Sequence, residues 1–228
     1  MKGNFLNIRS SAFAGSFYPA QSKNLLQLTT QLLDENKQTP GNAKAIIVPH
    51  AGYVFSGGVA ASAFNLLRET NDAIIFVIGS SHHSLFQGAA LETHDAYQTP
   101  LGNIAVNTEI TKTLAQNNNL FSLLSEPHEK EHALEVQIPF LQTIFPPSTT
   151  VVPILLGNAS TIEIKQMSDI LFPYFERTDT RFVISTDLSH YPPFDIAEET
   201  DHRVITSVCS GDHDNLKETL QHEASRHL

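Results

Sequence analysis

Residues 43–58 read AKAIIVPHAGYVFSGG, a short apolar run that ends at Pro49 and His50 and continues into small residues and two glycines. A continuous apolar run of this length, bounded by Pro and Gly, is typical of a strand that is buried on both faces. The run therefore predicts a buried strand over about 44–49 that carries a histidine at its carboxyl end.

Three further apolar runs predict strands over 73–78, 149–156 and 181–185. Segments with helical periodicity or helix-favouring composition lie between and around them, over 21–35, 59–67, 108–115, 131–144, 161–174, 198–208 and 215–222. Alternating strands and helices predict an α/β layered sandwich with a mostly parallel central sheet flanked by helices. Pro153 inside the third run predicts that this strand lies at a sheet edge or carries a bulge.

Length and composition are those of a folded globular chain. The 228 residues are 41% hydrophobic and 17% charged, well away from the low hydrophobicity and high charge of disordered proteins. A chain of this length is sufficient for one sizeable core. We therefore expect a single domain over 1–228.

The charge balance disfavours nucleic acid as a partner. The formal net charge is −10, and the 14 Lys and Arg residues are scattered along the chain, whereas phosphate binding needs a basic surface. No apolar run approaches the roughly 18 residues of a membrane span, and no signal-peptide core is present. The single cysteine, Cys209, fits a reducing compartment. The sequence thus predicts a soluble cytoplasmic protein.

Histidines follow three of the four predicted strands. His50 follows the first, His82 and His83 follow the second, and Asp187 and His190 follow the fourth. Because the carboxyl ends of parallel strands lie at one edge of a sheet, these side chains can converge there. Any one of these histidines alone is better explained as a structural group bonded to a loop carbonyl, but three strand ends together favour a shared site.

Imidazoles with one carboxylate suit Zn²⁺, Fe²⁺ or Cu²⁺, so the residue types predict a metal site without selecting the metal. Glu131, His132 and Glu135 have helical spacing and could contribute from one helix face, or the acidic residues could simply complement the helix dipole. Tyr53 could supply a pocket hydroxyl or pack in the core. These alternatives remain open from the residues alone.

Six motifs in order resemble the Memo family, whose microbial members are called AmmeMemoRadiSam system protein B. They are AGSFYP (14–19), PHAGY (49–53), GSSHH (79–83), TPLG (99–102), EHALEVQIPF (131–140) and STDLSH (185–190). The resemblance implies a fold similar to LigB-type class III extradiol dioxygenases and to nucleoside phosphorylase-like layers.

The resemblance also implies roles for particular residues. His50 and His82 match two of the family's metal ligands, and Asp187 and His190 match its active-site pair. The third family ligand, a cysteine in a C-terminal Cys-Gly segment, has no match here, so the chain is expected to be C-terminally short of the family pattern. Fe(II) is the implied metal, with Cu or Zn as alternatives, and a metal-free site is a further alternative.

Three functions follow from these observations. The first is a metal-dependent, dioxygenase-like oxidoreductase, with His190, Asp187 and His132 as catalytic residues and with Tyr53, His83 and Glu131 in the pocket. The second is a non-catalytic binding or scaffold protein that uses the same pocket, and the third is a metal-assisted hydrolase. The expected partner is an unidentified small molecule or peptide, with neither nucleic acid nor membrane, and self-association into a homo-oligomer is left open.

Overall fold

The computed structural model describes residues 7–38, 41, 43–67 and 72–226. Contacts divide the chain into two compact units, Met1–Thr186 and Asp187–Leu228, and each is described by itself. The expectation of a single domain over 1–228 stays a prediction.

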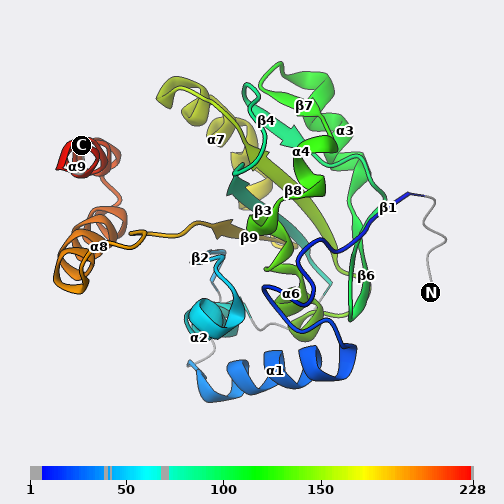
Figure 1. The fold of residues 1–228 in the computed structure, drawn as a ribbon. Helices are drawn as coiled ribbons and strands as arrows, with labels where there is room; N and C mark the ends of the chain where they lie inside the picture. The colour runs from blue at the N-terminus through cyan, green and yellow to red at the C-terminus, as the bar shows by residue number, and fades with distance from the viewer. Residues whose placement is uncertain (1–6, 39–40, 42, 68–71, 227–228) are drawn as a thin grey trace. The chain divides into compact units, whose positions relative to one another are not determined.

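The first unit is built on a sheet that has nine strands among the described residues (Figure 1). The strands are β1 (Ile8–Arg9), β2 (Ala45–Val48), β3 (Ile74–Ser80), β4 (Ala89–Leu91), β5 (Ala96–Thr99), β6 (Gly102–Val106), β7 (Phe121–Leu123), β8 (Thr150–Leu156) and β9 (Thr180–Ser185). The main order is β1-β5-β6-β8-β3-β9-β2, and β4 pairs with β8 and β7. All four strands predicted from apolar runs are present, as β2, β3, β8 and β9.

The four central strands run parallel, which confirms the mostly parallel sheet. β3 pairs with both β8 and β9, and β9 pairs in turn with β2. Their carboxyl ends therefore lie together at one edge of the sheet, the edge where open α/β sheets place their ligands.

The prediction that Pro153 marks an edge or bulge is wrong, because β8 is an interior strand. Beside β8, β6 pairs with Thr150 and Val151, whereas β4 pairs from Ile154 onward. Pro153 lies between these two pairings, where one neighbouring strand gives way to the next. A residue without an N–H group costs least at such a place.

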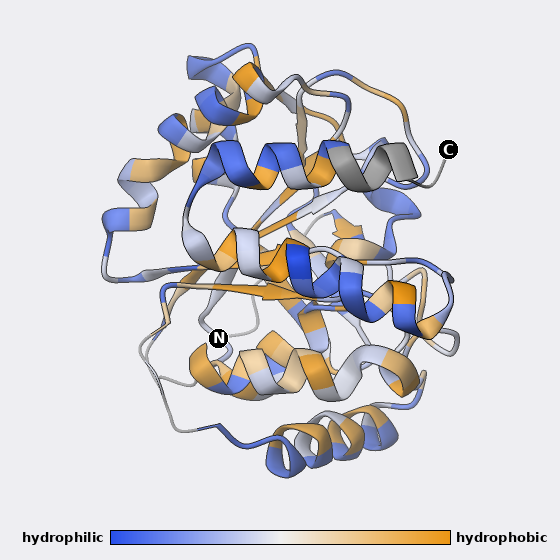
Figure 2. Cartoon of the chain, turned by 90° about the vertical axis from the view of Figure 1, so that its left-hand side faces the viewer, coloured by the Kyte–Doolittle hydropathy of each residue, from blue (hydrophilic) through white to orange (hydrophobic). Residues whose placement is uncertain are grey.

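Alternate side chains of the central strands point to opposite faces of the sheet and enter two cores. On β3, Ile75 and Val77 belong to one cluster and Phe76 belongs to the other. Helices α1 (Ser22–Glu35), α2 (Tyr53–Phe64) and α6 (Ile138–Ile144) cover the first face, and α3 (Thr108–Asn117) and α7 (Thr161–Glu176) cover the second. Figure 2 shows the resulting pattern, with hydrophobic strands inside and mixed helices outside.

Two predicted helices differ from the structure. The helix expected over 59–67 begins earlier, at Tyr53, and ends in a short 3-10 turn. The helix expected over 131–144 is two pieces, α5 (His132–Glu135) and α6, and a separate short helix, α4 (Glu126–Glu129), precedes them. Glu131 is extended, with φ −100° and ψ 124°, and it caps α5 instead of lying inside a helix. Glu131 and Glu135 therefore do not share a helix face.

The second unit consists of α8 (Phe194–Ser210) and α9 (His213–Arg226). Gly211 ends α8 with φ 68°, a left-handed conformation that glycine adopts without strain. The hydroxyl groups of Ser207 and Thr219 lie 2.9 Å apart and join the two helices. Among the described helices of both units, none combines the length and apolar character needed to cross a membrane.

Candidate metal centre

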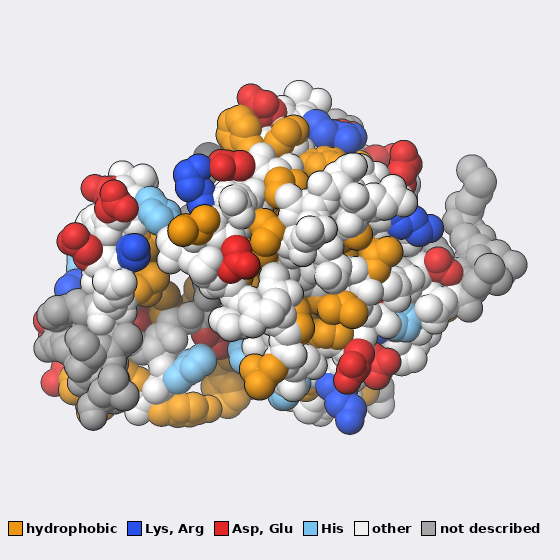
Figure 3. All heavy atoms as spheres, turned by 90° about the horizontal axis from the view of Figure 1, so that it is seen from above, with side chains coloured by type: hydrophobic (Ala, Val, Ile, Leu, Met, Phe, Trp, Pro, Cys, Tyr) orange, Lys and Arg blue, Asp and Glu red, His pale blue; other side chains and the backbone are white. Residues whose placement is uncertain are grey.

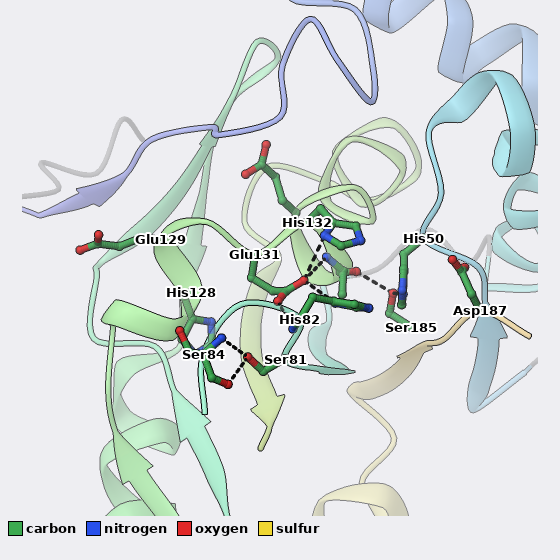
Figure 4. Close-up of polar contacts among 12 residues, drawn as sticks. His50, Ser81, His82, Ser84, His128, Glu129, Glu131, His132, Ser185 and Asp187 are labelled. Carbon is green, nitrogen blue, oxygen red and sulfur yellow. Dashed lines mark hydrogen bonds and ion pairs between the residues drawn. The ribbon is translucent and has the colours of Figure 1, made fainter. Parts of the chain in front are cut away.

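Three histidines meet at the carboxyl edge of the first unit's sheet. His50, His82 and His132 each offer a ring nitrogen that lies within 4.8 Å of the other two (Figure 4). The ring centroids of His82 and His132 are 4.5 Å apart, and that of His50 is 5.0 Å from His82 and 5.3 Å from His132. The predicted convergence of His50 and His82 is thus observed, and His132 joins them.

Each histidine comes from a different element. His50 follows β2, His82 follows β3, and His132 is the first residue of α5, which packs against the end of β3. Gly79 allows this close approach, since a Cβ there would lie 3.0 Å from a methyl group of Leu134. His50 is buried, whereas the side chain of His82 is 33% exposed, so the group opens to solvent on one side.

Ser185, at the end of β9, determines which nitrogen of His50 carries the proton. The Ser185 hydroxyl donates its only hydrogen to the Ala133 carbonyl at 2.6 Å and accepts from Gln137 Nε2 at 2.9 Å. Its oxygen lies 3.1 Å from His50 Nδ1, which must therefore be the N–H donor. His50 accordingly carries its lone pair on Nε2, the form that can bind a metal.

Glu131 orients His82 in the same manner. Its carboxylate accepts hydrogen bonds from the His82 ring Nδ1 at 2.9 Å, from the His82 backbone N at 2.7 Å and from the Ala133 backbone N at 3.0 Å. Burial would raise the pKa of Glu131, but these hydrogen bonds bring it below its usual value. Glu131 thus caps α5 and also contacts the histidine group, but from an extended position and not from a helix face shared with Glu135.

His132 is held as a neutral imidazole. Burial lowers the pKa of His132 to about 4; the nearby Glu131 carboxylate opposes this shift, and the His82 and His50 rings reinforce it. Its Nδ1 is buried 3.3 Å from Glu131 Oε1 and makes no hydrogen bond within the described part of the chain. Phe13 and Phe17 pack against the ring, with centroids 5.5 and 5.0 Å away.

This donor set fits a transition metal. Imidazole is a favoured ligand of zinc, copper and iron, and a bound histidine commonly donates its other N–H group to a carboxylate or similar oxygen. His82 and His50 make such contacts, to Glu131 and Ser185 respectively. A buried imidazole nitrogen without a hydrogen bond, as on His132, is costly unless something else occupies it.

The other predicted residues lie as follows. Tyr53 is buried in the core and its hydroxyl donates to the Val136 carbonyl at 2.6 Å. His83 is exposed beside the cluster, its ring centroid 6.0 Å from that of His132. Asp187 and His190 belong to the second unit, where Asp187 Oδ2 and His190 Nε2 are 3.5 Å apart. Their convergence with the histidines of the first unit stays a prediction.

Ser185 and Gln137 were not predicted as site residues, although both fall within the motifs quoted above. Their signal is a polar side chain in an otherwise apolar stretch: Ser185 ends the run FVIS (182–185), and Gln137 interrupts VQIPF (136–140). Both are almost completely buried.

A family model described as Memo-like protein matches residues 9–226, nearly the whole chain. The chain belongs to the Memo family. The resemblance inferred from the six motifs is thereby confirmed.

Relatives of known name agree with this assignment. A MEMO1 family protein of Thermoplasma volcanium is 32% identical over 220 residues, which cover 95% of this chain and 80% of the relative. A MEMO1 family protein of Methanopyrus kandleri is 30% identical over 225 residues, covering 93% and 80%. The memo-1 homologue of Caenorhabditis elegans is 33% identical over 184 residues, covering 80% of this chain and 53% of that protein.

The surface of this Memo-family chain agrees with its acidic composition. On the face drawn in Figure 3, Lys and Arg side chains are scattered among acidic, apolar and uncharged residues.

Proposed function

We propose that this Memo-family chain binds a divalent transition metal through His50, His82 and His132 and uses it to act on a small-molecule or peptide ligand. The observation that carries the proposal is the meeting of three imidazoles from three separate elements, with ring nitrogens within 4.8 Å of one another. A single structural histidine needs no such partners, whereas a metal site requires them.

The surrounding residues have distinct roles in this proposal. Glu131 holds the His82 ring, and Ser185 with Gln137 holds the His50 ring, so that each keeps a lone pair on Nε2. The low pKa of His132 keeps that ring unprotonated at neutral pH, so no proton has to be displaced there. Phe13 packs on the same ring and shields one side of it from water.

Two metals are favoured by different observations. The family resemblance to extradiol dioxygenases favours iron, but three histidines are also a ligand set of catalytic zinc. Bound iron would supply electron exchange with oxygen or substrate, whereas bound zinc would lower the pKa of a bound water. The leading function is a dioxygenase-like oxidoreductase, and the second candidate is a metal-assisted hydrolase.

Metal titration of the purified protein tests the proposal. Fe²⁺ under anaerobic conditions, Zn²⁺ and Cu²⁺ are each added to chelator-stripped protein, and binding is followed by calorimetry. We expect one ion to bind per chain, and His50→Ala and His132→Ala each to weaken binding by more than about 100-fold, beyond the loss caused by removing an outer-shell partner.

His94→Gln is the matched control, because His94 lies outside the three-histidine group and the variant retains a donor near Glu92. It should bind metal like the wild type. Wild-type protein that binds none of these ions, or variants that bind as tightly as the wild type, would contradict the proposal. Oxygen consumption by the iron form then separates the oxidoreductase from a zinc form that hydrolyses esters or amides without using oxygen.

A further inference from the structure

A buried arginine contacts the segment that carries His132. Arg9, the last residue of β1, is 2% exposed. Its guanidinium donates to the carbonyl of His128 at 2.6 Å, to the carbonyl of Glu131 at 3.0 Å and to Glu135 Oε2 at 2.6 Å. The Arg9 side chain therefore makes several hydrogen bonds to residues 128–135, which lie more than 100 residues further along the chain.

The carbonyl groups held by Arg9 belong to α4 and to the turn that follows it and leads into His132. This turn joins α4 to α5, and Glu131 is extended within it. With its carbonyl bound to Arg9, Glu131 directs its carboxylate to His82 and to the backbone N–H of Ala133. The position of the turn therefore fixes both the Glu131 carboxylate and the first residue of α5.

Glu135 is the counter-ion of Arg9 and extends the same network. Its Oε2 also accepts from the Ala12 backbone N at 2.9 Å, and its Oε1 accepts from the Phe13 backbone N at 2.8 Å and the Tyr18 hydroxyl at 2.5 Å. These bonds hold the segment that places the Phe13 ring against His132. A buried ion pair with this many hydrogen bonds holds the backbone segments around it in a fixed arrangement.

We propose that Arg9 is a positioning residue of the metal centre, which sets Glu131 and His132 in the arrangement that binds the ion. This inference rests on the proposed function. A guanidinium is needed because its planar fork donates in several fixed directions at once, whereas an ammonium group is a compact point charge. If Arg9 only stabilised the fold, changing it would alter melting but not the metal affinity of the folded protein.

The test is a Co²⁺ titration of Arg9→Lys, followed through the visible spectrum of the bound ion. Lysine retains a positive charge near Glu135 but cannot reproduce the bonds to the His128 and Glu131 carbonyls. We expect Co²⁺ affinity to fall by about 10- to 100-fold, as for other outer partners of metal ligands. We also expect the spectrum of the saturated variant to shift, because the ligand geometry changes.

Arg181→Lys is the matched control. Arg181 also donates to backbone carbonyl groups, those of Thr178 and Thr180, but at the amino end of β9, away from the carboxyl edge. It should leave the Co²⁺ affinity and spectrum unchanged. The metal-free melting temperature of each variant is measured alongside, so that a loss of folding is not mistaken for a loss of affinity.

If Arg9→Lys does not fold, the double variant Arg9→Met with Glu135→Gln carries the same test, because it removes both charges and leaves neither buried alone. It should also bind Co²⁺ more weakly than the wild type. Wild-type affinity and spectrum in the folded variant would overturn the positioning role while leaving the metal site intact. Wild-type protein that binds no Co²⁺ would overturn this inference, and protein that also binds none of Fe²⁺, Zn²⁺ and Cu²⁺ would overturn the proposed function with it.

Discussion

At the scale of single residues, the hydroxyl of Ser185 illustrates how one hydrogen determines what a neighbouring ring can bind. It donates to the Ala133 carbonyl and therefore can only accept from His50 and Gln137. That arrangement keeps the lone pair of His50 on Nε2. A histidine whose tautomer is fixed before the metal arrives does not have to reorganise when it binds.

Ser185→Ala should therefore weaken metal binding by about 10- to 100-fold with little change in the ligand residues themselves. The change leaves the N–H groups of His50 and Gln137 without this acceptor, so the His50 ring is no longer held. Calorimetric titration measures the effect. Ser62→Ala is the control, because the Ser62 hydroxyl donates to the Gly58 carbonyl within α2. Equal losses in the two variants would contradict this role of Ser185.

The sequence allowed the meeting of His50 with His82 to be predicted, because strand ends of a parallel sheet share an edge. The contribution of Ser185 could not be predicted in this way. Its role depends on the register of β9 against β2, which places Ser185 beside Val48, two residues before His50. Register is set by the packing of the whole sheet and not by any local pattern.

At the scale of elements, α2 has two contrasting faces. Phe64 is completely buried and stacks on Phe140, with ring centroids 4.9 Å apart, whereas Phe55 is 86% exposed. Val54 and Val59 are also exposed on this helix. One face thus contributes to the core, and the other presents apolar side chains outward.

Phe64→Ala should lower the free energy of unfolding by about 3–5 kcal/mol, because it removes a buried ring and leaves a cavity. Phe55→Ala, the same change on the exposed face, should cost no more than about 0.5 kcal/mol. Urea denaturation of the two variants measures both values. A Phe55→Ala cost as large as that of Phe64→Ala would show that the outer face of α2 is covered in solution.

Strands and helices were predicted best where the apolar pattern of the sequence was uninterrupted. The four central strands were recognised because each is an uninterrupted apolar run. The segment 131–144 was predicted as one helix, since its residues favour helix, but Glu131 instead caps α5 and Pro139 begins a new turn in α6. Tertiary hydrogen bonds from Arg9 and His82 determine the local conformation there, and no local pattern reports them.

At the scale of the whole molecule, a buried histidine makes stability depend on pH. His128 is completely buried; its Nδ1 lies 2.9 Å from the Tyr97 hydroxyl and its Nε2 lies 3.1 Å from the Ala90 carbonyl. The neutral ring satisfies both contacts, with Nε2 donating and Nδ1 accepting. Burial lowers the pKa of His128 below its usual value, although Glu92 and the Ala90 carbonyl oppose the shift.

The sign of the pH effect follows from this shift. Above about pH 6.5 His128 is neutral in both states, but below it the unfolded chain binds a proton that the folded chain does not. Stability should therefore fall as the pH drops from 7.5 to 5, by at most about 1.4 kcal/mol per pH unit from this group. His132, whose pKa is also lowered, acts in the same direction.

Thermal melting between pH 7.5 and 5 measures this dependence in metal-free protein. His128→Asn should be less stable at pH 7.5 but should lose less stability on acidification than the wild type does. His213→Asn, which changes an exposed histidine, should retain the wild-type dependence. An unchanged pH dependence in His128→Asn would mean that other groups are responsible.

The place of β9 in the sheet also governs when the centre can form during synthesis. β9 lies between β3 and β2, which precede His82 and His50, yet of the described strands it is the last in chain order and so the last to leave the ribosome. Until Thr180–Ser185 has been made, β2 lacks the strand it pairs with and His50 has no Ser185 beside it. In a nascent chain the Ser185 contact that orients His50 is therefore made only when the first unit is almost complete, so the metal site proposed above requires nearly all of that unit.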